Sequence, residues 1–282
     1  MDPLVSSDWL AAHLDDPDLR LLECTVDLTP GPGGFEAASM LDRWAEGHLP
    51  TSAYADLTDD LSDPESDLRF TMPTAERFAS AMEALGVGDG TTVVLYDRRF
   101  TMWATRVWWM LRAFGFERCA VLDGGYRNWV AEGRPITTDP APGRPPATFT
   151  PAPRPNMIAR LDQVEAAIGG GTTCLINALS PENHSGADDS YGRPGHLPGA
   201  DNVFALSLLD GETHRYRPVE ELRTLFERVP QGTPVITYCG GGIAATSDAF
   251  VLHALLGHDD VAVYDGSLSE WVRDPHRPLE VQ

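Results

Sequence analysis

The apolar residues of this chain follow two alternating patterns, short continuous runs and longer runs with helical spacing. Short β-branched runs such as residues 92–96 (TVVLY) and 235–238 (VITY) are typical of buried strands. Apolar residues recur at helical spacing in residues 103–114, 219–229 and 248–256. Strands that alternate with helices in this way predict an α/β fold with a mainly parallel sheet flanked by helices.

This pattern occurs twice, with a constant offset of 142 residues, as between Asp97 and Cys239. The strand-like run before Asp97 matches the run before Cys239. An Asp-Gly pair follows in each half, at Asp123 and Asp265, and a helical segment with a tryptophan comes next. Because the order of the landmarks is the same, the two halves are interpreted as copies of one α/β unit.

The segment between the two copies is rich in proline, at positions 140, 142, 145, 146, 151, 153 and 155. Proline lacks a backbone N–H and fixes φ, so this density excludes a helix or a central strand. We therefore expect an N-terminal domain at residues 1–137, an extended linker at residues 138–156 and a C-terminal domain at residues 157–282.

Cys239 stands where a predicted strand ends, and three glycines and a predicted helix follow it. Ligands of parallel sheets bind at the carboxyl ends of strands. Curled glycine backbone and a helix start point N–H groups toward an anion, which favours the reactive thiolate. We predict that Cys239 is a nucleophile and that the anion-binding loop consists of Gly240, Gly241, Gly242, Ile243 and Ala244.

Composition and charge narrow the classes of function. The net charge of −21 argues against nucleic acid and against an anionic membrane surface as partners. No secretory signal and no apolar run of about 20 residues is visible, so no membrane association is expected. The sequence has four widely scattered cysteines, Cys24, Cys119, Cys174 and Cys239, and this spacing does not suit a zinc site. We expect no metal and no cofactor. We also expect the protein to reside in the reducing cytoplasm.

Five motifs in this order resemble the tandem-domain rhodanese family, the thiosulfate and 3-mercaptopyruvate sulfurtransferases. They are GHLP at residues 47–50 and 195–198, VLDGGYRNW at 121–129, VITYCGGGI at 235–243, and LGHDDVAVYDGSLSEW at 256–271. The resemblance implies two rhodanese-like domains, each a mainly parallel sheet flanked by helices, of which only the C-terminal one is catalytic. Asp97 stands at the cysteine position of the first copy, and a carboxylate cannot carry sulfane sulfur.

The resemblance also implies the chemistry and the partners. The Cys239 thiolate takes the outer sulfur of a small donor, thiosulfate or 3-mercaptopyruvate, and a persulfide forms on the cysteine. A thiol, cyanide or a sulfur-acceptor protein then removes the sulfur.

The sequence departs from this family where arginines usually contact the donor. Leu179 and Asn183 fill those two positions, and Phe70 aligns with a histidine of the N-terminal domain. A buried anion without a cation is costly, so another group must contact the donor. The candidates for substrate binding are Arg193, His184, Arg98 and Arg99, with Arg106 of the first domain as a further possibility.

One alternative function remains open, and a second is disfavoured by the sequence. A persulfide carrier or relay protein would accept sulfur from one protein, pass it to another and show little activity with small donors. A cysteine phosphatase or arsenate reductase also wraps a loop around an oxyanion, but it needs an arginine six residues after the cysteine, where this chain has Ala245.

Overall fold

The computed structural model describes residues 1–31 and 34–281, and within these ranges each half of the chain contains one five-stranded parallel sheet. The first sheet is ordered β1 (Leu4–Val5), β7 (Cys119–Leu122), β6 (Thr92–Tyr96), β2 (Leu19–Glu23) and β5 (Ala53–Tyr54). The second is ordered β10 (Asp201–Asn202), β9 (Cys174–Asn177), β11 (Val235–Tyr238), β12 (Val261–Tyr264) and β8 (Ile158–Ala159). The predicted α/β architecture with two copies of one parallel unit is confirmed.

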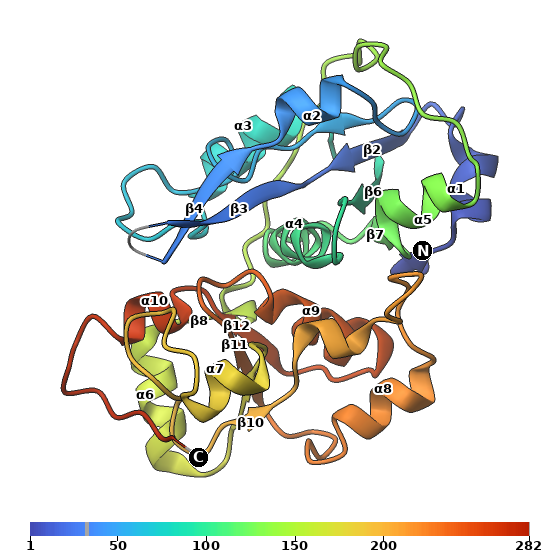
Figure 1. Cartoon of the computed structure of the whole chain (residues 1–282). Helices are drawn as coiled ribbons and strands as arrows, with labels where there is room; N and C mark the ends of the chain where they lie inside the picture. The colour runs from blue at the N-terminus through green and yellow to red at the C-terminus, as the bar shows by residue number, and fades with distance from the viewer. Residues whose placement is uncertain (32–33, 282) are drawn as a thin grey trace.

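Helices cover both sheets (Figure 1). The N-terminal half has α1 (Ser7–His13), α2 (Leu41–Ala45), α3 (Ala75–Ala84), α4 (Met102–Ala113) and α5 (Gly125–Ala131). The C-terminal half has α6 (Leu161–Gly170), α7 (Pro181–Ser185), α8 (Val219–Leu225), α9 (Ala245–Phe250) and α10 (Ser267–Trp271). Single turns occur at Pro155–Met157, Ala205–Leu208 and Val251–Leu255, the last of which continues α9. An antiparallel hairpin, β3 (Val26–Gly31) and β4 (Gly34–Ser39), extends from the first sheet.

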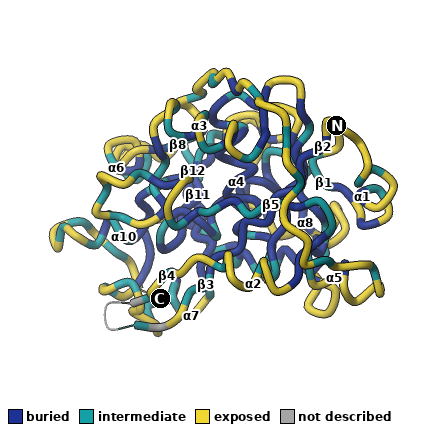
Figure 2. Tube along the Cα trace, turned by 90° about the horizontal axis from the view of Figure 1, so that it is seen from above, coloured by how far each residue is buried: buried dark blue, intermediate teal, exposed yellow. Residues whose placement is uncertain are grey.

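The core follows from the apolar runs. Every residue of β2 and of β11 is buried, as expected for central strands of a sheet with helices on both faces. Figure 2 shows buried residues concentrated around α4 and β11, in the middle of the molecule. The tryptophans of α4 lie in this core: Trp103, Trp108 and Trp109.

The two halves pack against each other through α4 and α9 (Figure 1). The hydroxyl oxygens of Thr105 and Thr246 lie 2.9 Å apart. The rings of Trp108 and Phe250 meet edge to face, with centroids 4.9 Å apart. Because α9 follows β11 directly, this packing turns the carboxyl end of β11 toward the first half.

The proline-rich segment at residues 138–154 contains no helix or strand and lies partly against the first half. The Phe149 N–H donates to the Glu83 carboxylate at 3.0 Å, and the Ala152 N–H donates to the Phe114 carbonyl at 2.8 Å. None of the helices described for this chain is both long and apolar enough to span a bilayer.

Candidate active site

The loop at residues 239–244 connects the central strand β11 to α9, and Cys239 is its first residue. The Cys239 side chain is buried, with 2% of its surface exposed. Among the described residues, the N–H groups of Gly240, Gly241, Ile243 and Ala244 find no hydrogen-bond acceptor. Unpaired amides around a buried sulfur form a site that favours negative charge.

The segment that begins α10 fixes the loop backbone. The Ser267 hydroxyl accepts hydrogen bonds from the N–H groups of Cys239 and Gly242, each at 3.1 Å. The same hydroxyl donates to the Tyr264 carbonyl at 2.7 Å. The Leu268 N–H donates to the Cys239 carbonyl at 3.0 Å. These bonds engage the Cys239 carbonyl and the N–H groups of Cys239 and Gly242, and none of them uses the remaining loop amides.

The backbone conformation at position 242 requires glycine. Its φ is +75°, and a Cβ there would lie 2.6 Å from the Asp265 carbonyl oxygen. Arg106 of the first half donates to the Gly242 carbonyl at 3.3 Å and pairs with the Asp265 carboxylate at 2.7 Å. Since its side chain is fully buried, Arg106 supports the loop from behind and is not available to bind a donor.

Asp97 occupies the equivalent point of the first half, at the end of β6. Its carboxylate accepts four backbone N–H bonds of 2.9–3.2 Å, from Arg99, Thr101, Trp103 and Ala104. Burial raises the pKa of Asp97, while these four hydrogen bonds oppose the rise. By the offset of 142 residues, the amides of Arg99 and Thr101, which the Asp97 carboxylate binds, correspond to the free amides of Gly241 and Ile243 in the second loop.

Cys239 opens into a cleft of about 840 Å³ between the two halves. Leu179, Asn183 and Phe70, the positions where the sequence departs from the family, all line it. Its walls are mainly apolar and aromatic, with Leu28, Phe35, Phe100, Met102, Tyr191, Phe204 and Leu206 among the lining residues. The cleft is much larger than a donor of five to seven heavy atoms would need.

The structure does not bring three of the sequence-predicted arginines to this cleft. Arg98 contacts the Glu23 carboxylate at 2.5 Å and lies 4.1 Å above the Tyr126 ring. Arg99 pairs with Asp27 at 2.7 Å, and Arg193 donates to the Asp274 carbonyl at 3.2 Å. Their candidacy for substrate binding is corrected in this respect, since each is directed to a partner outside the cleft lining.

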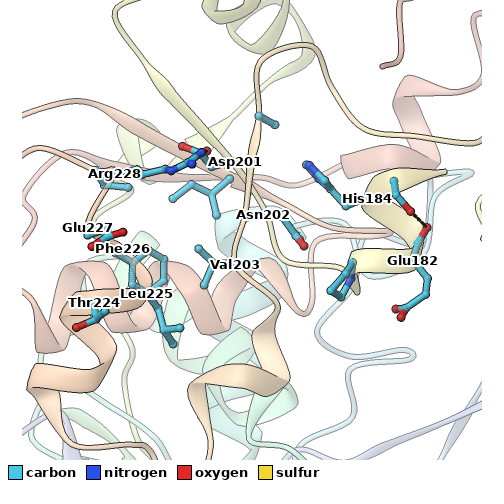
Figure 3. Close-up of a pocket in the computed structure, with 15 residues that line it drawn as sticks. Glu182, His184, Asp201, Asn202, Val203, Thr224, Leu225, Phe226, Glu227 and Arg228 are labelled. Carbon is cyan, nitrogen blue, oxygen red and sulfur yellow. Dashed lines mark hydrogen bonds and ion pairs between the residues drawn. The ribbon is translucent and has the colours of Figure 1, made fainter. Parts of the chain in front are cut away.

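His184 also lies elsewhere, in a second cavity of about 550 Å³ beside α7 (Figure 3). Its ring stacks on His196 with centroids 3.7 Å apart, and its Nδ1 contacts the Asn177 amide at 3.2 Å. Burial, together with the neighbouring His196, lowers the pKa of His184 to about 4. These contacts make His184 part of the packing of the C-terminal half.

Two arginines that the sequence reasoning missed line the cleft, Arg69 from the first half and Arg273 from the second. Arg273 donates to the Asp67 carbonyl at 3.0 Å, and neither arginine forms an ion pair with a described residue. Their proximity in sequence to motif residues could have identified them, because Arg69 directly precedes Phe70 and Arg273 lies two residues after Trp271 of the last motif.

The other cysteines differ from Cys239 in their surroundings. All four are free thiols, and burial raises the pKa of Cys24, of Cys119 (to about 12) and of Cys174. Cys24 and Cys119 lie in the hydrophobic core and Cys174 packs against it, as is usual for cysteines that act as small apolar residues.

Comparison with known proteins adds an independent observation. A family model described as the rhodanese-like domain matches residues 6–132 and 161–274. The thiosulfate/3-mercaptopyruvate sulfurtransferase 1 of Arabidopsis thaliana is 32% identical in an alignment that covers 99% of this chain and 78% of that protein. The sulfur carrier protein TtuD of Thermus thermophilus is 32% identical, with 95% and 93% covered. The crystal structure of SseA from Escherichia coli, reported with the rhodanese fold of 3-mercaptopyruvate sulfotransferases, matches with a TM-score of 0.82 and 30% identity, over 95% of this chain and 99% of that chain.

Proposed function

The chain belongs to the rhodanese family and is a sulfurtransferase, and we propose that it carries sulfane sulfur on Cys239 between a small donor and a thiophilic acceptor. One observation supports this most strongly. A buried cysteine ends a central strand inside a loop whose amides have no acceptor among the described residues. Such a loop stabilises the anionic thiolate before transfer and the anionic persulfide after it.

The reaction has two half-steps. The Cys239 thiolate attacks the outer sulfur of the donor, and a new S–S bond forms. With thiosulfate, the old S–S bond breaks and sulfite leaves with its electron pair. With 3-mercaptopyruvate, the C–S bond breaks and the thiol proton ends on the methyl group of pyruvate. An acceptor thiolate or cyanide then attacks the terminal sulfur and regenerates the Cys239 thiolate.

The loop amides and the cleft arginines divide the work of binding. Gly240, Gly241, Gly242, Ile243 and Ala244 form the loop around the sulfur, and Arg69 and Arg273 supply positive charge on the cleft walls. Charge-assisted bonds from a guanidinium suit a carboxylate or a sulfonate-like group. We propose these two arginines in place of Arg193, His184, Arg98 and Arg99 as the groups that contact the donor.

The first domain is proposed to be catalytically inactive. The carboxylate of Asp97 fills its amide cradle, so no sulfur atom can be bound there. Its role is then to provide Phe70, Phe100 and Met102 as one wall of the cleft.

A persulfide relay is the second candidate function. A cleft of about 840 Å³ leaves space for the side chain of a partner protein beside Cys239. The relative from Thermus thermophilus that is named a sulfur carrier protein supports this alternative. In either case the sulfur resides on Cys239. Because all four cysteines are free thiols, we propose a reducing compartment such as the cytoplasm.

Steady-state assays with thiosulfate and, separately, with 3-mercaptopyruvate test the proposal, with cyanide as acceptor. Wild type should turn over at least one of them, and Cys239→Ser should lose activity by at least about 10³-fold. Cys174→Ser is the matched control and should keep wild-type rates. If neither donor is used but a protein persulfide loads the chain, the relay function holds. Full activity in Cys239→Ser would contradict both functions.

A further inference from the structure

The ring of Tyr191 lies directly on the backbone of Gly240, the residue after Cys239. A Cβ on Gly240 would be 1.9 Å from Cε1 of Tyr191 and 2.3 Å from its Cζ. Real Cβ atoms do not approach other atoms this closely, so the ring takes the space of a side chain at position 240. The neighbouring Gly241 differs, since the nearest atom to its Cβ would be the Ser269 hydroxyl at 3.9 Å.

Other contacts hold the Tyr191 ring beside the cysteine. Phe35 of the β3–β4 hairpin lies against it, with ring centroids 6.1 Å apart. Burial, followed by the charge of Cys239, raises the pKa of the Tyr191 phenol. Tyr191 thus joins the hairpin of the first domain to the loop of the second.

The position of the ring decides which charges can lie close to the sulfur. With position 240 closed, the loop carries no cation. The cations of the cleft are Arg69 and Arg273, and two carboxylates also line it, Asp67 and Asp189. The charge on thiosulfate is adjacent to the transferred sulfur, whereas a mercapto acid carries its carboxylate several bonds away. A dianion against an aromatic wall without an adjacent cation is costly to desolvate.

We propose that Tyr191 is a specificity-determining residue, whose ring keeps position 240 free of a side chain and so directs the cleft toward organic sulfur donors that carry a carboxylate and away from thiosulfate. This inference rests on the proposed function of Cys239. It predicts that the effect of a side chain at position 240 depends on the residue at position 191, and this dependence can be measured.

The test is a double-mutant cycle between Tyr191→Ala and Gly240→Arg, with kcat/KM measured for 3-mercaptopyruvate and for thiosulfate. Gly240→Arg alone should lower kcat/KM for both donors by at least about tenfold, because the new side chain collides with the ring. The double variant should recover 3-mercaptopyruvate activity. Its preference should also shift toward thiosulfate by about tenfold or more, since an arginine then lies beside the sulfur.

Two controls separate the ring from general effects. Tyr191→Phe keeps the ring and should keep the donor preference of wild type. Gly241→Arg adds the same cation where a side chain has room, so its effect should be the same with or without Tyr191. Equal effects of Gly240→Arg in the presence and absence of the ring would overturn the proposal.

Alkylation of Cys239 gives a readout that does not depend on sulfur transfer. The ratio of its rates with iodoacetate and iodoacetamide reports positive charge near the sulfur. This ratio should rise in the double variant and not in Tyr191→Ala. If wild type uses neither donor while the ratio rises as expected, the contact of Tyr191 with position 240 stands, but the small-donor function falls and the donor preference proposed for Tyr191 falls with it. An unchanged ratio in the double variant would contradict the assignment.

Discussion

Asp97 and Cys239 follow equivalent strands, and similar loops surround a carboxylate in one domain and a sulfur atom in the other. Four N–H groups close on the carboxylate of Asp97, two of them equivalent to the Gly241 and Ile243 amides, which have no acceptor among the described residues. A buried N–H gains most from a charged acceptor. The first domain therefore satisfies its loop internally, and the second can satisfy its loop only with a sulfur anion or a ligand.

Asp97→Ala should destabilise the fold. Four amides that now donate to the carboxylate would lose their acceptor in a buried site, and we expect the free energy of unfolding to fall by about 2–4 kcal/mol. Denaturant unfolding measures this difference. Asp97→Asn keeps one oxygen as acceptor and should cost less. An Asp97→Ala protein as stable as wild type would contradict the role given to this carboxylate.

Asp248 of α9 predicts a dependence of stability on pH. It is fully buried, its carboxylate oxygens have no hydrogen-bond partner among the described residues, and burial raises its pKa well above the usual value. The folded state thus keeps a proton that the unfolded state releases near pH 4. Stability contributed by this group is therefore lost as the pH rises above about 4.

Asp248→Asn removes this titration and should raise the free energy of unfolding relative to wild type, by more at pH 8 than at pH 5. Urea unfolding of both proteins at the two pH values checks the sign. A difference between them that does not change with pH would show that Asp248 ionises freely in the folded state.

Among the elements, those built from continuous patterns were predictable from the sequence. The helix expected at residues 103–114 is α4 (Met102–Ala113), and the strands before Asp97 and Cys239 are β6 and β11. Local apolar spacing is enough to predict strands and helices, without knowledge of distant contacts. The repeat then predicts the equivalent strand or helix in the other half. The loop that begins at Cys239 could be located because its strand, glycines and helix are adjacent in sequence.

The walls of the cleft were not predictable in the same way. Leu28 and Phe35 reach it on a hairpin, and Arg69 and Arg273 reach it on irregular segments of different domains. No local pattern encodes which loops of two packed domains meet. Arg98 and Arg99 follow Asp97 in sequence, yet ion pairs with Glu23 and Asp27 hold them within the first domain.

The connection between β11 and α9 predicts the effect of substitutions in its glycines. In Gly242→Ala the new Cβ would lie 2.6 Å from the Asp265 carbonyl, at a φ of +75°. We expect a loss of about 1–3 kcal/mol in stability and a lower rate of sulfur transfer. Gly241→Ala, where the Cβ has room, is the control. Similar effects of the two substitutions would show that the close approach at Gly242 is not important.

At the scale of the whole molecule, α4 and α9 hold the halves together and so form the cleft. Trp108 packs on Phe250, and Arg106 joins the first half to Asp265 of the second. We propose the division into residues 1–137, a linker at 138–156 and residues 157–282. Because α4 and α9 already hold the halves together, we expect that the linker is not needed for their association.

Cleavage at a protease site inserted at the exposed residues 138–141 should leave both fragments associated in gel filtration, with sulfur transfer retained. Arg106→Met in the cleaved protein should weaken the association, because Asp265 loses its ion-pair partner in the interface and keeps only the Met72 N–H. Arg99→Met, which breaks an ion pair within the first half, should not. Separation of the fragments immediately after cleavage would contradict the proposed interface.

The central claim is that one sulfur atom is carried on Cys239. It is tested most directly by mass spectrometry of the full chain and its peptides after exposure to 3-mercaptopyruvate, before and after addition of cyanide. We predict a gain of one sulfur atom on the peptide that contains Cys239, its removal by cyanide, and no gain in Cys239→Ser. Sulfur found on Cys24, Cys119 or Cys174, or an undiminished gain in Cys239→Ser, would contradict the account.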